Sequence, residues 1–171
     1  MSTVKALPQS TRLPQQSRNW GGEIQTKGTG LPSRLILHAV EKFGKTSFAA
    51  QAPGVIFGMP ADETGLLTLI DAGQLPETPF LPPFTTWAEV LDAIRYLTEE
   101  EHQFKTLALD TLNGLEKLCH TAVCEREYGG DWGKKGFANY QQGYDVALTE
   151  WRLFIAALER LRATKRIGII A

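Results

Sequence analysis

The feature that most constrains the fold is a short apolar run that leads directly into a Gly-Lys-Thr sequence and then into a helical pattern. The run is RLILHA, from Arg34 to Ala39, and its composition fits a buried strand of a parallel sheet. The next segment, VEKFGKTSFAAQA, has a helical pattern in its second half, which follows Gly44, Lys45 and Thr46. We therefore expect a strand, a loop and a helix in direct succession.

Further apolar segments alternate with helical patterns along the rest of the chain. GVIFGM, KTLALD and RIGIIA each fit a buried strand. Thr86 and Glu89 form a capping-box pattern at the start of TWAEVLDAIRYLTEEE, and we expect further helices at about 111–127 and 141–164. This alternation predicts an α/β fold, with an open, mainly parallel sheet, helices on both faces, and a ligand site at the carboxyl ends of the strands.

The chain is expected to consist of an N-terminal arm and one domain. Residues 1–30 lack sustained periodicity, are rich in Pro, Gln and Gly, and carry an excess of basic residues, so we expect a flexible basic arm. Residues 31–171 form the domain. Its stretch between the second strand and Thr86 is rich in Pro and Gly and is expected to be a long connection. Because the sequence stops at Ala171, directly on an apolar strand, we expect the domain to be truncated at its C-terminus.

Composition excludes several classes of protein. The formal net charge is -1 and no apolar run approaches the roughly 20 residues that span a bilayer, so we expect no membrane partner. The N-terminus lacks the apolar core of a secretory signal, which makes the cytoplasm the expected compartment. Cys119 and Cys124 are interpreted as free structural thiols, and His102 and His120 have no partners at metal-ligand spacing.

The Gly-Lys-Thr sequence matches the end of the phosphate-binding loop GxxxxGK[ST]. We expect Gly44 to let the backbone approach phosphates, Lys45 to reach the β and γ phosphates of ATP, and Thr46 to place its hydroxyl on Mg²⁺. Ala39 stands in place of the first glycine, and a positive φ there would cost on the order of 1 kcal/mol. The expected nucleotide-binding residues are Ala39, Val40, Glu41, Lys42, Phe43, Gly44, Lys45, Thr46 and Ser47.

Acidic residues are expected beside this loop. LALD brings Asp110 to the same edge of the sheet, where its carboxylate is expected to hold Mg²⁺, and it could also cap the next helix. Hydrolysis also needs a group that orients and deprotonates water, and Thr111 stands where an acid could have followed Asp110. Asp62 and Glu63 follow the second strand, and Glu63 has the longer reach. The alternative is that ADETG is a solvated turn.

With these motifs in this order, the chain resembles the RecA-like ATPases, and among them small phage-encoded recombination proteins implicated in single-strand annealing. The likeness covers about residues 31–171 and is carried by AVEKFGKTSFAAQAP, Glu63, KTLALDTLNGLEKL and the long helix before RIGIIA. It implies catalytic roles for Glu63 and Lys45, and a final strand that lies between the phosphate-loop strand and the Asp110 strand. The corresponding hypothesis is a homo-oligomeric, DNA-dependent ATPase that binds ATP between subunits and assists recombination.

The resemblance also draws attention to residues 128–144, which lie where RecA-like proteins place their first DNA loop. Aromatic side chains there could stack on bases of single-stranded DNA while lysines meet phosphates, and the glycines let such a loop adapt. The alternative is that the aromatic rings pack the loop onto its own domain. The candidate DNA-binding residues are Trp132, Lys134, Lys135, Phe137 and Tyr140.

Two other functions remain open on the sequence alone. A kinase for nucleosides or other small molecules could use the same phosphate loop, although no arginine-rich lid segment follows the third strand. A non-catalytic nucleotide-binding or assembly module is the other alternative, and the replacement of the first glycine by Ala39 motivates it.

Overall fold

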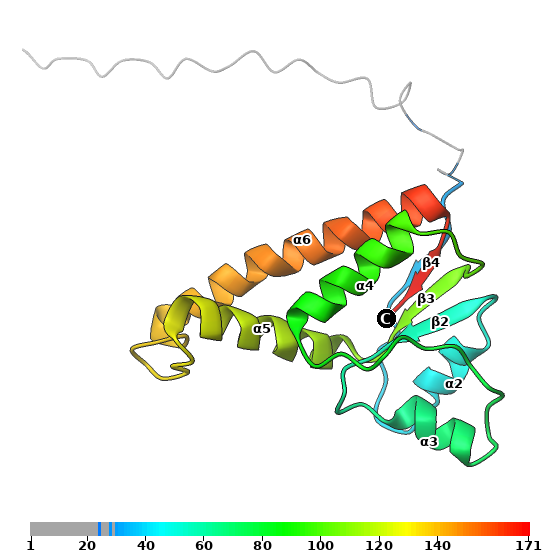
Figure 1. Cartoon of the computed structure of the whole chain (residues 1–171), viewed down its shortest axis with the longest axis horizontal. Coiled ribbons are helices and arrows are strands. Elements are labelled where there is room, and N and C mark those ends of the chain that lie inside the picture. Colours follow the sequence, from blue (N-terminus) through cyan, green and yellow to red (C-terminus); the bar gives the residue numbers. More distant parts are fainter. Residues whose placement is uncertain (1–23, 25–27, 29) are drawn as a thin grey trace, which may run out of the picture. The chain divides into compact units, whose positions relative to one another are not determined.

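The parallel sheet that the sequence predicts is present in the computed structural model, which describes Ile24, Gly28 and residues 30–171. The expected flexible arm at residues 1–30 therefore falls almost entirely outside the described residues. Within the unit Leu31–Ala171, four parallel strands follow the order β1-β4-β3-β2 (Figure 1). The strands are β1 (Arg34–Leu35), β2 (Val55–Gly58), β3 (Thr106–Leu109) and β4 (Gly168–Ile170). The last strand lies between the phosphate-loop strand and the strand before Asp110, as the resemblance implies.

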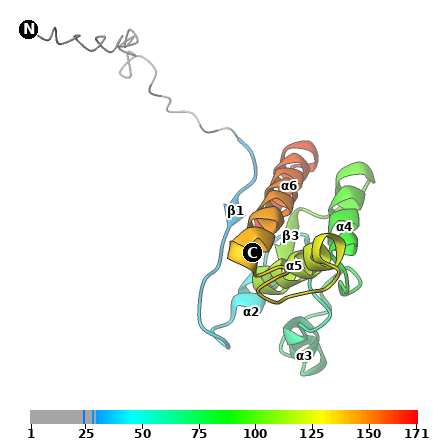
Figure 2. The same ribbon diagram turned by 90° about the vertical axis from the view of Figure 1, so that its left-hand side faces the viewer.

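Helices cover both faces of this sheet, which confirms the expected α/β architecture. Figures 1 and 2 show α3 on the opposite side of the strands from α4 and α6. Leu107 and Leu109 of β3 pack with the layer of α4, α5 and α6, whereas Ala108 between them packs with α2 and α3. None of the helices in the described part of the chain is long and apolar enough to cross a membrane. The helices are α2 (Lys45–Ala50), α3 (Gly65–Asp71), α4 (Trp87–Glu99), α5 (Leu112–Tyr128), the 3₁₀ turn η1 (Asn139–Gln141) and α6 (Gln142–Lys165).

Helix α4 shows how local sequence fixes an element. The backbone N–H of Glu89 donates to the Thr86 hydroxyl at 3.3 Å, and the Glu89 carboxylate accepts from the Thr86 N–H at 3.1 Å. This reciprocal pair is the expected capping box, and it starts the helix at Trp87. The buried positions that follow recur every three or four residues, which turns one stripe of α4 toward the sheet.

Strand β1 is shorter than the sequence suggested. Only Arg34 and Leu35 are in the strand, although pairing continues loosely through the Leu37 N–H, which donates to the Ala171 carbonyl at 2.6 Å. The side chain of Ile36 is 79% exposed. The apolar run therefore belongs to an edge strand rather than to one buried on both faces, and the chain leaves the sheet before Ala39.

The long connection after β2 contains more structure than its Pro and Gly content suggested. It includes α3, and its final part lies parallel to the outer edge of β2. The Phe57 N–H donates to the Pro79 carbonyl at 2.9 Å, and the Phe84 N–H donates to the Met59 carbonyl at 2.8 Å. This segment satisfies backbone groups that an edge strand would otherwise expose, and it holds the end of β2 in place.

Candidate functional site

A cleft of about 980 Å³ lies at the carboxyl ends of the strands, where parallel α/β sheets place their ligands. The side chains of Val40 and Phe43 are each 76% exposed and do not line it, so these two could serve a ligand only through their backbone. The other expected nucleotide-binding residues all line the cleft: Ala39, Glu41, Lys42, Gly44, Lys45, Thr46 and Ser47.

The loop before α2 owes its shape to residues in the left-handed region. Gly44 has φ 91° and precedes the first residue of α2, and Lys42 has φ 61°. A Cβ at Gly44 would meet nothing within 4 Å, so glycine is favoured there by the backbone angle rather than by lack of space. Positive φ does not occur at Ala39. The strain considered for that alanine therefore does not arise.

The ammonium group of Lys45, the first residue of α2, lies against carbonyls of the loop that precedes the helix. Nζ donates to the Ala39 carbonyl at 2.8 Å and to the Val40 carbonyl at 3.0 Å. These bonds hold a positive charge inside the cleft, beside the first turn of α2. An incoming phosphate oxygen could take over the same donors, because the ammonium group carries three of them.

Thr46 and Asp110 both line the cleft and contact each other there. The Thr46 hydroxyl donates to Oδ2 of Asp110 at 2.6 Å, which joins α2 to the end of β3. A hydroxyl and a carboxylate supply the oxygen ligands that Mg²⁺ prefers, so these two residues fit the expected metal. The alternative role considered for Asp110 is wrong, because Thr111 is the N-cap of α5 and accepts from the Gly114 N–H at 3.3 Å.

Of the two acids after β2, the structure brings Glu63 into the cleft. Oε1 of Glu63 accepts from the Gly65 N–H at 3.2 Å. A Cβ at Gly65 would lie 3.1 Å from this oxygen and 3.7 Å from the Thr46 hydroxyl, so both groups converge on the start of α3. Asp62 is not among the lining residues and instead forms an ion pair with Lys117 at 3.3 Å. The role of Glu63 as a base stays a prediction.

Several cleft residues were missed by sequence reasoning. Thr68 and Leu69 come from α3, and Gln74 follows it, so they were overlooked when that stretch was interpreted as a connection. The apolar run LLTLI after Gly65 was the available signal. His38, at the end of the first apolar run, also lines the cleft.

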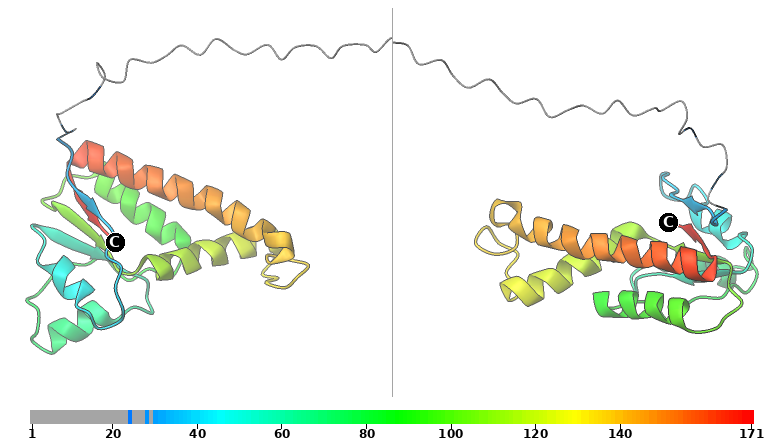
Figure 3. Two further views of the ribbon diagram at one scale, coloured as in Figure 1. Left: turned by 180° about the vertical axis from the view of Figure 1, so that it is seen from behind. Right: turned by 90° about the horizontal axis from the view of Figure 1, so that it is seen from above.

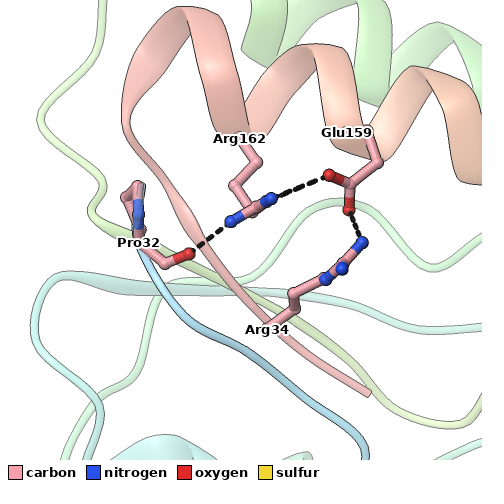
Figure 4. A network of polar contacts seen from close by, with 4 residues as sticks. All are labelled: Pro32, Arg34, Glu159 and Arg162. Carbon is pink, nitrogen blue, oxygen red and sulfur yellow. Dashed lines mark hydrogen bonds and ion pairs between the residues drawn. The ribbon is translucent and has the colours of Figure 1, made fainter. Parts of the chain in front are cut away.

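The start of β1 is attached to α6 by a polar network, shown in Figure 4. The Arg162 guanidinium donates to Glu159 at 2.9 Å and to the Pro32 carbonyl at 2.7 Å, and Arg34 donates to the other Glu159 oxygen at 2.6 Å. The hydrogen bond from Arg162, together with that from Arg34, lowers the pKa of Glu159 below its ordinary value. The network holds the chain at the beginning of the strand that leads to Ala39.

The candidate DNA-binding segment lies at the end of α5 and α6 that points away from the strands of the sheet (Figure 3). Helix α5 starts just after Asp110 and has 17 residues, which at the usual rise of 1.5 Å per residue separates its ends by about 25 Å. At this distal end, Trp132 is 49% and Tyr140 is 91% exposed. Lys134 and Lys135 are exposed as well.

Phe137 does not belong to that exposed surface. Its side chain is fully buried, and its ring centroid lies 4.8 Å from both Trp132 and Tyr144. A Cβ at Gly143 would come within 2.5 Å of the same ring, so the close packing depends on that glycine. The expectation that Phe137 stacks on bases is therefore corrected, and the alternative, packing onto its own domain, applies to this residue.

Within residues 30–171, the remaining reactive side chains form no second cluster. Cys119 and Cys124 are both buried and free, and burial raises the pKa of Cys119 to about 11, which keeps the thiol protonated and unreactive. Among the described residues, no three His, Cys, Asp or Glu side chains gather where they could hold a metal ion.

Comparison with known proteins agrees with this geometry. A family model described as AAA domain matches residues 31–171. This range is the unit that carries the sheet, the helices and the cleft. No curated protein and no solved structure matches the chain.

Proposed function

The chain belongs to the AAA domain family of P-loop ATPases, and from this premise we propose that it binds ATP together with Mg²⁺ in the cleft and hydrolyses it. The observation that carries the proposal is the 2.6 Å hydrogen bond between Thr46 and Asp110, together with the ammonium group of Lys45, which precedes Thr46 at the start of α2. A phosphate loop and an acidic strand end, 64 residues apart in sequence, are thereby brought into one site.

Each group in the cleft has a task in this proposal. Lys45 would exchange the loop carbonyls for oxygens of the β and γ phosphates. Thr46 and Asp110 would hold Mg²⁺, which neutralises charge on the phosphate oxygens. Glu63 would accept the proton of the attacking water, after its carboxylate gives up the bond from the Gly65 N–H.

Nucleotide binding and turnover test this proposal separately. We expect the unaltered chain to bind a fluorescent ATP analogue with Mg²⁺ and to release phosphate. Lys45→Ala should remove binding, whereas Glu63→Gln should retain binding and lose turnover. Glu77→Gln is the matched control, because Glu77 is exposed and does not line the cleft. Absence of nucleotide binding by the unaltered chain would contradict the proposal.

The same assay separates the alternative functions. Transfer of the γ phosphate to a small acceptor in preference to water would favour the small-molecule kinase. Binding without any turnover, unchanged in Glu63→Gln, would favour the non-catalytic assembly module. Release of phosphate that is lost in Glu63→Gln would support the proposal of an ATPase.

We further propose that the protein acts on single-stranded DNA in phage recombination or annealing, as a homo-oligomer. Support comes from the resemblance to RecA-like recombination proteins and from the exposed distal residues Trp132 and Tyr140 beside two lysines. Exposed aromatic rings and lysines are the groups that stack on bases and meet phosphates.

Fluorescence anisotropy with a labelled oligonucleotide tests the DNA proposal. Replacing Lys134 and Lys135 by alanine should weaken binding and reduce the salt dependence of the affinity, because each phosphate contact releases counterions. Light scattering with and without ATP measures the oligomeric state. No DNA binding at low salt, together with no stimulation of phosphate release by DNA, would exclude this role.

A further inference from the structure

We propose that helix α5 sets the position of Glu63, and that Gly114 and Lys117 are the positioning residues through which it acts. The inference rests on the proposed role of Glu63 in ATP hydrolysis. It concerns the loop between β2 and α3, which carries Glu63 but is attached to other elements at several points. Three contacts carry the argument.

The first contact makes the loop a closed turn. The Glu63 N–H donates to the Pro60 carbonyl at 3.0 Å, so the backbone of Glu63 follows that of Pro60. The Ala61 N–H donates to the Phe84 carbonyl at 2.8 Å, which holds the outer side of the turn. Pro60 itself is buried. Whatever fixes Pro60 therefore also limits where Glu63 can lie.

The second contact joins Pro60 to α5. A Cβ at Gly114 would lie only 2.4 Å from Cγ of Pro60, so the first turn of α5 packs directly on the proline ring. Glycine is a poor helix former, and no positive φ calls for it at this helical position. Glycine is needed at this position because the Pro60 ring occupies the space that a side chain would take. Helix and turn cannot move toward each other.

The third contact lies one turn further along the same face of α5. Nζ of Lys117 is 3.3 Å from Oδ2 of Asp62, the residue before Glu63. Both side chains are well exposed, so the pair adds little to the stability of the fold. Its effect is to restrict the orientation of the residue next to Glu63.

Through these contacts, α5 connects the two acidic residues of the cleft, Asp110 and Glu63. The helix begins with the N-cap Thr111, directly after Asp110, and it touches the Glu63 turn through Gly114 and Lys117. Asp110 and Glu63 are therefore positioned relative to each other by one rigid element. A displaced α5 would change the geometry of hydrolysis without removing any group that binds the nucleotide.

A double-mutant cycle on the exposed pair tests the proposal in the full chain. Lys117→Ala and Asp62→Asn should each lower kcat about two- to five-fold, the range expected for an exposed ion pair, and should leave the dissociation constant of the ATP analogue within about two-fold. The double variant should be no slower than either single one, because both remove the same contact. Lys117→Arg keeps the positive charge, so its kcat should stay close to that of the unaltered chain. Glu116→Ala, on the adjacent exposed position of α5, should leave kcat unchanged.

Gly114→Ala tests the contact with Pro60. Its methyl group must displace Pro60, so kcat should fall about ten-fold or more, with binding retained in a variant whose circular dichroism is that of the folded protein. Unchanged kcat in Lys117→Ala and Asp62→Asn, or strictly additive losses, would overturn the inference while leaving the ATPase proposal intact. No turnover by the unaltered chain would instead defeat the ATPase proposal, and this inference with it.

Discussion

The hydroxyl of Thr46 donates to the carboxylate of Asp110 at 2.6 Å, so the first turn of α2 and the end of β3 share one polar contact in the cleft. We predict that Thr46→Ala weakens Mg²⁺-dependent nucleotide binding about ten-fold or more, because the variant lacks the hydroxyl that is expected to hold Mg²⁺ and that orients the Asp110 carboxylate. Titrations of an ATP analogue with Mg²⁺ and with EDTA measure the effect.

Thr46→Ser is the control for this prediction. It keeps the hydroxyl and removes only a methyl group, so its affinity should stay close to that of the unaltered chain. Equal affinities of Thr46→Ala and the unaltered chain in the presence of Mg²⁺ would contradict the assignment of Thr46 to the metal.

We predict that Ala39→Gly leaves nucleotide affinity within about two-fold. Ala39 does not have a positive φ, so glycine would relieve no strain at this position, and the Ala39 carbonyl would still accept from Lys45. The same titration checks the result. A large gain in affinity would mean that the loop adopts a left-handed conformation at residue 39 when nucleotide binds.

Local signals in the sequence account for much of the fold. The capping box at Thr86 located the start of α4, because two reciprocal hydrogen bonds at one helix end depend on neighbouring residues alone. The apolar run before Asp110 located β3 because that strand is buried on both faces. In both cases consecutive residues carry the signal, although β3 forms only with β2 and β4 as its partners in the sheet.

Contacts between distant segments account for most of what the sequence did not reveal. The limited extent of β1 depends on its place at the edge of the sheet, beside a strand more than 130 residues later (Arg34 pairs with Ile169). The pairing of Phe57 with Phe80 cannot be inferred from a Pro-rich stretch. In the cleft, motif spacing identified Thr46, Asp110 and Glu63 as candidates. It could not predict that Gly114 packs on Pro60, because this contact joins two segments about 50 residues apart in the sequence.

Glu159 gives the protein a predicted pH dependence. Its pKa lies below the ordinary value of 4.5, chiefly because of Arg162, so its ionised form stabilises the folded state. This contribution is fully present above pH 4.5 and is lost as the pH falls through the lowered folded pKa. We predict that Glu159→Gln lowers the melting temperature at pH 7 by at most about 2–4 °C, and that this difference shrinks below pH 4.5.

The expected shift is small because the Glu159 side chain is 36% exposed and water screens the ion pairs. Thermal unfolding of both proteins between pH 3 and pH 7 measures it, and Glu77→Gln serves as an exposed carboxylate without a described ion pair. A difference in melting temperature that grows toward low pH would have the wrong sign for this explanation.

Two aromatic residues of the distal segment are expected to respond in opposite ways. Phe137 is fully buried, so Phe137→Ala should lower the free energy of unfolding by about 3–5 kcal/mol through the lost contacts and the cavity left behind. Tyr140 is 91% exposed, so Tyr140→Ala should change stability by less than about 0.5 kcal/mol and instead weaken binding of single-stranded DNA. Urea denaturation and oligonucleotide anisotropy give the two measurements. Weakened DNA binding by a still folded Phe137→Ala protein, with no effect of Tyr140→Ala, would show that the buried ring, not the exposed one, supports the DNA-binding surface.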